Sequence, residues 1–103
     1  MLKIHKKAKA EEDLIDIWTY SFGQWGMAQA DQYIDRLDNL IKTIAANPGI
    51  GTNCDSVRKG YRQFHVGKHY IFYRYTTDTV FIIRVLGNAM DYQSILQDEE
   101  LEV

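Results

Sequence analysis

The spacing of apolar residues changes in the middle of the chain, and this change restricts the fold more than any other feature. Between residues 8 and 46, apolar side chains recur every three to four positions, which predicts two amphipathic helices. Gly23 and Gly26 interrupt this pattern, and Asn47-Pro48-Gly49 ends it because proline cannot continue a helix. Between residues 61 and 86, short aromatic and β-branched runs predict three strands joined by tight turns.

These elements predict an α+β fold of two layers. We expect an N-terminal strand at residues 2–6, then an α-helical hairpin packed on a three- to four-stranded antiparallel sheet. A C-terminal tail or short helix follows at residues 89–103. The chain of 103 residues supports a single core, so we expect one domain over residues 1–103, of which 89–103 is a C-terminal extension.

Regular alternation assigns the residues of the last strand to two faces. The expected sets are Phe81, Ile83 and Val85 on one face, and Val80, Ile82, Arg84 and Leu86 on the other. In the preceding hairpin, Gly67-Lys68 fits a two-residue turn with glycine first, and His65 and His69 are expected to face each other across it.

Composition and charge exclude several classes of protein. The net charge is −2, so a general nucleic-acid-binding protein is not expected, and any contact with a polyanion must be local, in the basic region 58–84. The single cysteine, Cys54, cannot form an internal disulfide, which favours the cytoplasm. No apolar run reaches the length of a membrane span. The scattered histidines lack metal-ligand spacing, so we expect no metal. We also expect no cofactor and no membrane contact.

Two clusters in the helical half have structural interpretations. Glu11, Glu12, Asp13 and Asp16 suit the start of a helix, where the helix dipole favours acidic side chains. Trp18 and Trp25 fall on the stripe expected to face the core.

One constellation points to a binding function. Arg58 and Arg62 precede and open the first of the three strands, and Arg74 and Arg84 lie on the next two. Arginines that converge on one face suit a partner rich in phosphate or carboxylate groups. No dedicated acid–base pair accompanies them, so the residues alone predict a small domain with a local basic face and a groove for a partner.

Seven short motifs in order along the chain give a more specific identification. They are Ala8–Leu14, Phe22-Gly23-Gln24-Trp25-Gly26, Ala28–Leu40, Asn47-Pro48-Gly49-Ile50-Gly51, Val57-Arg58-Lys59-Gly60-Tyr61-Arg62, Gly67–Arg74, and Val80–Leu86 with Met90-Asp91. This pattern resembles the ParE toxins of type II toxin–antitoxin systems, within the RelE/ParE superfamily. The resemblance covers nearly the whole chain. It departs at Gly87, where the family usually has histidine.

The resemblance implies a bacterial toxin that causes growth arrest and stabilises a plasmid or chromosome. Such a toxin is neutralised by a ParD-like antitoxin, in a complex that can be a higher-order hetero-oligomer. ParE toxins poison DNA gyrase, with the A subunit the expected contact, and do not act as enzymes. The RelE branch shares the fold but cleaves mRNA on the ribosome, so fold alone does not choose between the two. A third reading is an inactive homologue that acts only in the antitoxin complex. Sequence-specific nucleic-acid binding by the toxin alone is not expected.

The resemblance also suggests candidate sites. The expected target-binding residues lie in the C-terminal segment: Ala89, Met90, Asp91, Tyr92, Ile95 and Leu96. The expected antitoxin-binding residues are four apolar anchors, Trp18, Trp25, Tyr33 and Leu37, and a basic rim of Arg58, Arg62 and Arg74. Arg58, Arg62 and Arg84 form the expected basic face, and mRNA cleavage would draw on Arg58, Arg84 and Tyr92.

Overall fold

The computed structural model describes residues 1–97 and has the two-layer α+β architecture expected from the sequence. The elements in chain order are β1 (Lys3–Lys6), α1 (Ala8–Trp25), α2 (Met27–Ala46), the 3₁₀ helix η1 (Pro48–Ile50), β2 (Thr52–Asn53), β3 (Arg62–Val66), β4 (His69–Tyr75), β5 (Thr79–Gly87) and α3 (Tyr92–Gln97). Residues 98–103, which belong to the expected C-terminal extension, lie outside the described part.

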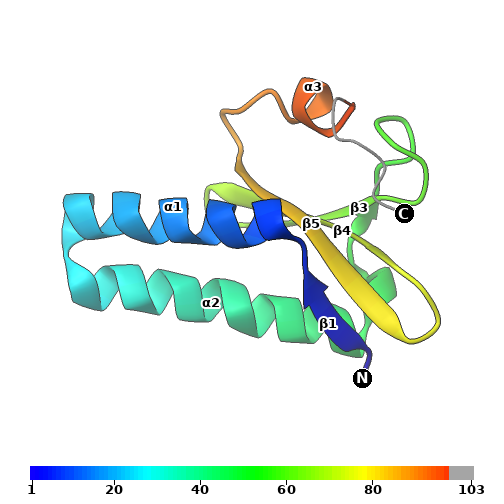
Figure 1. The fold of residues 1–103 in the computed structure, drawn as a ribbon, viewed down its shortest axis with the longest axis horizontal. Helices are drawn as coiled ribbons and strands as arrows, with labels where there is room; N and C mark the ends of the chain where they lie inside the picture. The colour runs from blue at the N-terminus through cyan, green and yellow to red at the C-terminus, as the bar shows by residue number, and fades with distance from the viewer. Residues whose placement is uncertain (98–103) are drawn as a thin grey trace.

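The sheet has five strands in the order β1-β5-β4-β3-β2 (Figure 1). β3, β4 and β5 form the expected antiparallel meander, and the two-residue β2 adds to its edge. β1 is an edge strand, as expected, but it pairs with β5 in parallel. It can do so because the whole helical hairpin and the meander separate the two strands in sequence, which is the length of connection that parallel pairing requires.

The helical hairpin packs on one face of the sheet and encloses the main core. Gly26 joins the helices with a φ of +89°, a conformation that favours glycine. Helix α1 runs unbroken through Gly23 to Trp25, one turn further than the glycine pattern indicates. The core residues share a helical face or one side of the sheet: Ala10, Leu14, Ile17, Leu37, Ile41, Ile44, Ala45, Val66, Ile71, Tyr73, Val80, Ile82 and Val85.

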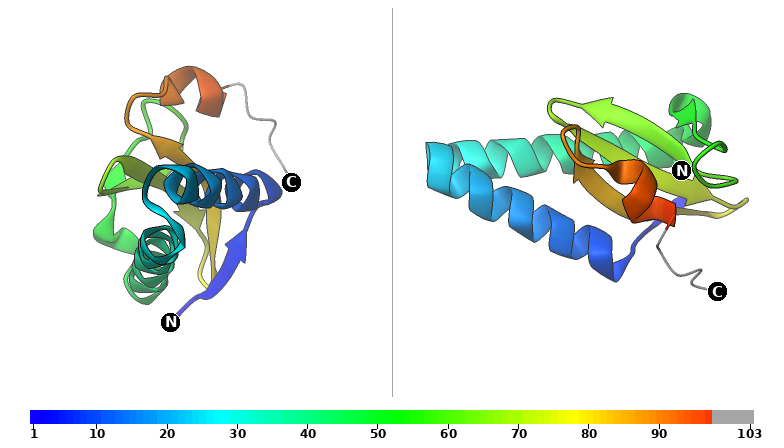
Figure 2. Two further views of the ribbon diagram at one scale, coloured as in Figure 1. Left: turned by 90° about the vertical axis from the view of Figure 1, so that its left-hand side faces the viewer. Right: turned by 90° about the horizontal axis from the view of Figure 1, so that it is seen from above.

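The short helix α3 covers part of the other face of the sheet. It rests on a second apolar cluster, whose buried members are Cys54, Tyr61, Phe72, Ile83, Leu86 and Leu96. Figure 2 shows α3 set apart from the α1–α2 hairpin, beyond the strands. Each face of the sheet therefore has its own helical cover, and the C-terminal helix makes the smaller one.

A bulge in β5 changes the face assignment expected for this strand. Phe72 lies opposite Arg84 and Tyr73 opposite Ile82, so Ile83 is an extra residue in β5. Because an extra residue reverses the alternation beyond it, Val85 joins Val80 and Ile82 on the hairpin side. Leu86 joins Ile83 on the α3 side. The expected faces are therefore wrong from the bulge onward.

The β3–β4 hairpin has the expected two-residue turn, with a positive φ at Gly67. The prediction that His65 and His69 face each other across the turn is wrong. His65 lies opposite Tyr70, and His69 lies opposite Val66. Because residues one position apart in a strand point to opposite faces, the two imidazoles lie on different sides of the sheet.

In residues 1–97 no helix combines the length and the apolar character of a membrane span.

Candidate functional site

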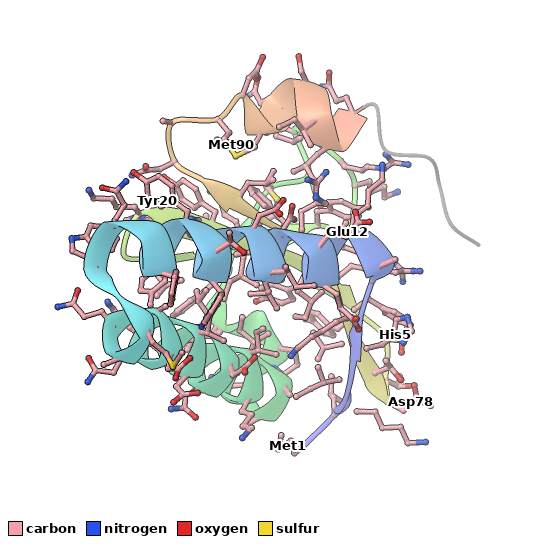
Figure 3. All side chains as sticks on the ribbon, turned by 60° about the vertical axis from the view of Figure 1, so that its left-hand side comes forward. Met1, His5, Glu12, Tyr20, Asp78 and Met90 are labelled. Carbon is pink, nitrogen blue, oxygen red and sulfur yellow. The ribbon has the colours of Figure 1, made fainter. Side chains whose placement is uncertain are left out.

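A groove lies between the free end of the helical hairpin and the β3–β4 turn. Its volume is about 660 Å³. Helix α1 supplies one wall, α2 the other, and the β3–β4 turn closes one side. The lining residues are Asp16, Ile17, Tyr20, Ser21 and Trp25 from α1, Gln29, Gln32, Tyr33 and Arg36 from α2, and Gly67, Lys68 and His69 from the turn. We call this the hairpin groove. Figure 3 shows Tyr20 on the α1 wall.

Exposed aromatic side chains make the hairpin groove unusual for a protein surface. Trp25 is 57% exposed and Tyr20 is 64% exposed. Their rings pack edge to face, with centroids 6.3 Å apart. Large rings held in this way expose apolar area at a low entropic cost, which suits a protein partner.

A hydrogen-bonded pair joins α2 to the sheet in this groove. The Tyr33 hydroxyl lies 2.6 Å from Nδ1 of His69, and the rings tilt against each other at 5.5 Å. Burial lowers the pKa of His69 and raises the pKa of Tyr33, so at neutral pH both groups are uncharged. The direction of this hydrogen bond depends on the tautomer of His69: the phenol donates to a bare Nδ1, or Nδ1–H donates to the phenol oxygen.

The charged border of the hairpin groove comes from residues that the sequence analysis did not single out. Arg36 and Lys68 line it, and both side chains are exposed. Asp16 lines the α1 side. The helical period of α2 places Arg36 three residues after Tyr33, on a neighbouring part of the helix surface. The three-residue spacing could therefore have predicted that the positive charge of Arg36 lies beside Tyr33, one of the predicted anchors.

A second hollow of about 730 Å³ adjoins the groove along α2. It shares Gln32, Arg36 and Gly67 with the hairpin groove. Its floor is the edge of β3 at residues 64–66. Strand β2 pairs only with Arg62 and Gln63, so within residues 1–97 no strand pairs with this part of the edge. An open strand edge is a template for pairing with another chain.

The four predicted apolar anchors divide between the groove and other places. Trp25 and Tyr33 line the hairpin groove. Trp18 is half-buried on α1, where its ring stacks on Phe22 at 5.2 Å and its indole nitrogen donates to Asp31 over 2.8 Å. Leu37 is fully buried in the main core. Its prediction as an anchor is wrong, because a fully buried side chain offers nothing to a partner.

The predicted core position of Trp25 is also wrong. The stripe that faces the sheet on α1 consists of Ala10, Leu14, Ile17 and Ser21. Figure 1 shows the end of α1 beyond the strands, and Trp25, the last residue of this helix, is 57% exposed.

The predicted arginines do not all converge on one face. Arg62 donates to the Gly51 carbonyl over 2.8 Å and lies opposite Tyr73, which belongs to the hairpin-side core. Arg58 donates to the Leu96 carbonyl over 2.9 Å, on the α3 side. Arg74 lies over the ring of Phe81, 4.2 Å from its centroid.

Arg84 pairs with a carboxylate instead of joining a basic face. Its guanidinium makes two hydrogen bonds to Asp13, of 2.7 and 2.9 Å. The basic face of Arg58, Arg62 and Arg84 is therefore not assembled, and neither Arg58, Arg62 nor Arg74 lines the hairpin groove. Asp13 has a specific partner on the sheet, beyond the dipole role expected for it.

The C-terminal candidates differ sharply in exposure. Ala89, Met90 and Asp91 form an exposed loop before α3. Tyr92 and Ile95 are half-buried, and Tyr92 packs on Phe72 with centroids 5.2 Å apart. Leu96 lies on the inner side of α3 and is fully buried. Its prediction as a surface contact is therefore wrong while α3 lies on the sheet.

Two observations concern the thiol and the possible metal ligands. Cys54 is buried, and burial raises the pKa of its thiol, which makes it a poor nucleophile. Among the described residues, no group of three histidine, cysteine or carboxylate side chains is placed to hold a metal ion.

The architecture defines a small α+β domain in which a helical hairpin and a sheet enclose a partner-sized groove. Comparison with known proteins makes this more specific. The family described as "ParE toxin of type II toxin-antitoxin system, parDE" matches residues 4–92. Toxin ParE1 of Caulobacter vibrioides is 43% identical over 94 residues, covering 91% of this chain and 95% of that protein. Toxin ParE1 of Mycobacterium tuberculosis is 43% identical over 83 residues, covering 80% and 85%.

A solved structure, the chromosomal ParDE toxin–antitoxin system from P. aeruginosa, has the same fold. The TM-score is 0.73 at 18% identity, covering 84% of this chain and 96% of that chain. This chain belongs to the ParE toxin family of type II toxin–antitoxin systems.

Proposed function

We propose that this toxin poisons DNA gyrase and is neutralised by a ParD-like antitoxin that occupies the hairpin groove. The observation that carries the antitoxin proposal is the groove itself, with Trp25 and Tyr33 as anchors and Arg36 and Lys68 beside them. The fold match to a ParDE system supports the kind of partner. The cytoplasm, where gyrase works, is the proposed compartment.

The two adjoining hollows suit two parts of one antitoxin. An amphipathic helix fits the hairpin groove, where its apolar residues contact Trp25 and Tyr20 and its acidic residues face Arg36 and Lys68. An extended segment fits the second hollow, where it adds to the open edge of β3 at residues 64–66. One chain that fills both hollows passes Gly67, which lines each of them. We also propose that toxin and antitoxin form a higher-order hetero-oligomer, as the family resemblance implies.

We propose the exposed loop Ala89–Asp91 as the contact with gyrase, and its A subunit as the partner. The half-buried Tyr92 and Ile95 and the buried Leu96 hold α3 on the sheet and so position this loop. Arg58 also helps to hold α3 on the sheet, because it donates a hydrogen bond to the Leu96 carbonyl at the end of this helix. These residues support the loop and do not contact the target.

We favour a binding toxin over an mRNA endonuclease because each group that cleavage would draw on already makes a contact within the protein. Arg84 is paired with Asp13, and Arg58 is bonded to Leu96. Tyr92 packs among Tyr70 and Phe72. General acid–base catalysis needs groups that can reach one substrate atom, and the contacts of these three side chains serve the fold instead.

The inactive-homologue reading depends on Gly87, which has room for a side chain. An added Cβ would meet Met90 at 3.8 Å and the Lys68 carbonyl at 3.9 Å, both ordinary contacts. The first atom of a side chain at position 87 therefore makes no clash. If the natural chain is not toxic and Gly87→His is, the inactive-homologue reading is correct.

The experiment is induction of the chain alone in bacteria, followed by gyrase supercoiling with purified toxin and ATP. Growth arrest with inhibited supercoiling supports gyrase as the target. Growth arrest with normal supercoiling and cleaved mRNA supports the endonuclease. Rescue by the co-expressed antitoxin tests the partner, and loss of rescue with Trp25→Ala tests the groove.

A further inference from the structure

An exposed apolar stripe runs along α1, beside α2. Its members are Ile15, Trp18 and Phe22, which follow one another at spacings of three and four and therefore share one side of the helix. Ile15 is 64% exposed and Phe22 is 45% exposed, although both side chains are large and apolar. We call these three residues the outer stripe. Figure 2 shows, in its right-hand view, no other element of residues 1–97 beyond α1 on the side away from the strands.

Contacts within the protein hold the outer stripe in a fixed shape. The Trp18 ring stacks on Phe22 with centroids 5.2 Å apart, and its indole nitrogen donates to Asp31 of α2 over 2.8 Å. These contacts order the two rings before any partner binds, which lowers the entropic cost of forming an interface. Ordered apolar side chains that stay exposed in this way mark a surface for protein contact.

The outer stripe is separate from the hairpin groove. Ile15, Trp18 and Phe22 are not among the residues that line the groove. Tyr20, which does line it, is two residues from Trp18 and therefore about 200° away around the helix. A partner on the outer stripe thus leaves the hairpin groove open for the antitoxin.

We propose that the outer stripe is the contact surface between two copies of this toxin, whose α1 helices pack antiparallel about a twofold axis. Apolar residues at spacings of three and four form the seam along which two helices pack. An axis between residues 18 and 19 places Ile15 of one copy opposite Phe22 of the other, with both Trp18 side chains near the axis. The stripe therefore complements itself, because an aliphatic side chain meets an aromatic ring at each end.

Charge favours the same arrangement at both ends of the helix pair. Counting outward from the axis, Glu11 of one copy lies opposite Gly26 of the other, the residue that precedes α2. Within residues 1–97, no side-chain hydrogen bond caps the start of α2, and its first turn contains no acidic residue. The amide groups there form a positive helix end that favours a carboxylate. Glu11 is exposed, and it supplies one carboxylate from each copy.

The dimer should be weak and should coexist with the antitoxin. A single pair of helices makes a small interface, and small interfaces give transient complexes. We therefore expect a Kd in the micromolar range. Both hairpin grooves remain open in the dimer, so two toxin copies can enter one assembly with their antitoxins. The dimer does not depend on gyrase as the target.

The test is sedimentation equilibrium of the purified full chain without antitoxin, over about a hundredfold range of concentration. We expect a monomer–dimer equilibrium in the micromolar range. Ile15→Glu should weaken the dimer at least about tenfold, because it sets a charge against the Phe22 ring of the other copy. Ile50→Glu makes the same chemical change at an isoleucine that is 40% exposed on η1. This control should change the Kd less than about twofold.

Disulfide trapping tests the direction of the two helices. Chains with Ile15→Cys and chains with Phe22→Cys are mixed in equal amounts and oxidised mildly, and the linked dimers are identified by mass spectrometry. The antiparallel arrangement predicts that the mixed disulfide, between positions 15 and 22, predominates. A parallel arrangement would join like chains. The natural Cys54 is buried, so it does not compete for the new thiols.

Three results would overturn the proposal: a monomer at every concentration, equal losses for Ile15→Glu and Ile50→Glu, or disulfides between like chains only. A monomer whose affinity for the antitoxin falls with Ile15→Glu would also overturn it, and would assign the outer stripe to the antitoxin. Thermal unfolding of each variant checks that the substitutions leave the fold intact. A dimer that has no effect on gyrase would contradict the proposed function and leave this inference standing.

Discussion

Asp13 on α1 and Arg84 on β5 are 71 residues apart in sequence and form a two-pronged ion pair, with N–O distances of 2.7 and 2.9 Å. The same carboxylate accepts the backbone amide of Val85 over 2.9 Å. Strand β1 ends at Lys6, opposite Ile82, so the edge of β5 beyond that point needs another acceptor. Asp13 supplies it, and thereby fixes the position of α1 against the sheet.

Loss of this carboxylate should destabilise the fold strongly. The two side chains are 12% and 16% exposed, so Asp13→Ala removes a two-pronged ion pair from a largely buried guanidinium. We expect a loss of about 3–5 kcal/mol in the free energy of unfolding, measured by urea denaturation. Glu12→Ala, on the exposed neighbouring residue, should change it by less than ~0.5 kcal/mol. Equal effects of the two variants would contradict the anchoring role.

A methyl group at Gly51 should also destabilise the protein, for a steric reason. A Cβ there would lie 2.5 Å from the Tyr73 hydroxyl and 2.8 Å from the Gln63 carbonyl. The hydroxyl also accepts the Gly51 amide and donates to the Pro48 carbonyl, so it cannot move away without losing both bonds. We expect Gly51→Ala to cost about 1–3 kcal/mol in thermal or urea unfolding.

Gly49 offers the matched control for this substitution. An added Cβ there meets nothing within 4 Å. Gly49→Ala should therefore leave the unfolding midpoint nearly unchanged. A stable Gly51→Ala variant would show that the loop can rearrange around Tyr73.

The stability of the protein should fall in mild acid because of His69. Burial lowers the pKa of His69 below its usual 6.5 in the folded state, so the unfolded chain binds more protons as the pH falls. The contribution of this group is complete above pH 6.5 and is lost progressively as the pH falls toward the lowered value. Urea unfolding between pH 7.5 and 5.5 should therefore show a larger loss for the natural chain than for His69→Gln. Parallel pH curves would contradict this.

The hairpin groove predicts a surface substitution that affects binding without affecting folding. Trp25 is 57% exposed and lines the groove, whereas Met27 is 59% exposed and does not line it. Trp25→Ala should weaken antitoxin binding by at least about tenfold, measured by calorimetry, because aromatic anchors dominate interface energies. Met27→Ala should have little effect on it. Both variants should unfold at nearly the natural midpoint, and equal binding losses would place the antitoxin elsewhere.

The sequence predicted the elements well because their signals are local. The period of the apolar residues identified both helices, and Gly67 identified the turn between β3 and β4. The bulge at Ile83 has no comparable signal, since a β-branched run reads the same with or without an extra residue. For the same reason the outward positions of β5 could not be assigned from alternation alone.

The candidate site was less predictable because it depends on which residues become neighbours in space. Trp25 and Tyr33 were predicted as anchors, and the structure places both in the lining of one groove. The burial of Leu37 and the pairing of Arg84 with Asp13 depend on how the hairpin lies across the sheet. Spacing along the chain carries no information on that contact.

The most direct test of the central claim is the DNA product of a gyrase reaction that contains the purified toxin. Closed circular plasmid, gyrase and ATP are incubated with increasing toxin, then treated with detergent and protease. The account predicts that linear, cleaved plasmid accumulates with toxin and disappears when the antitoxin is added first. Intact plasmid at every toxin concentration, from a preparation that arrests growth, would contradict it.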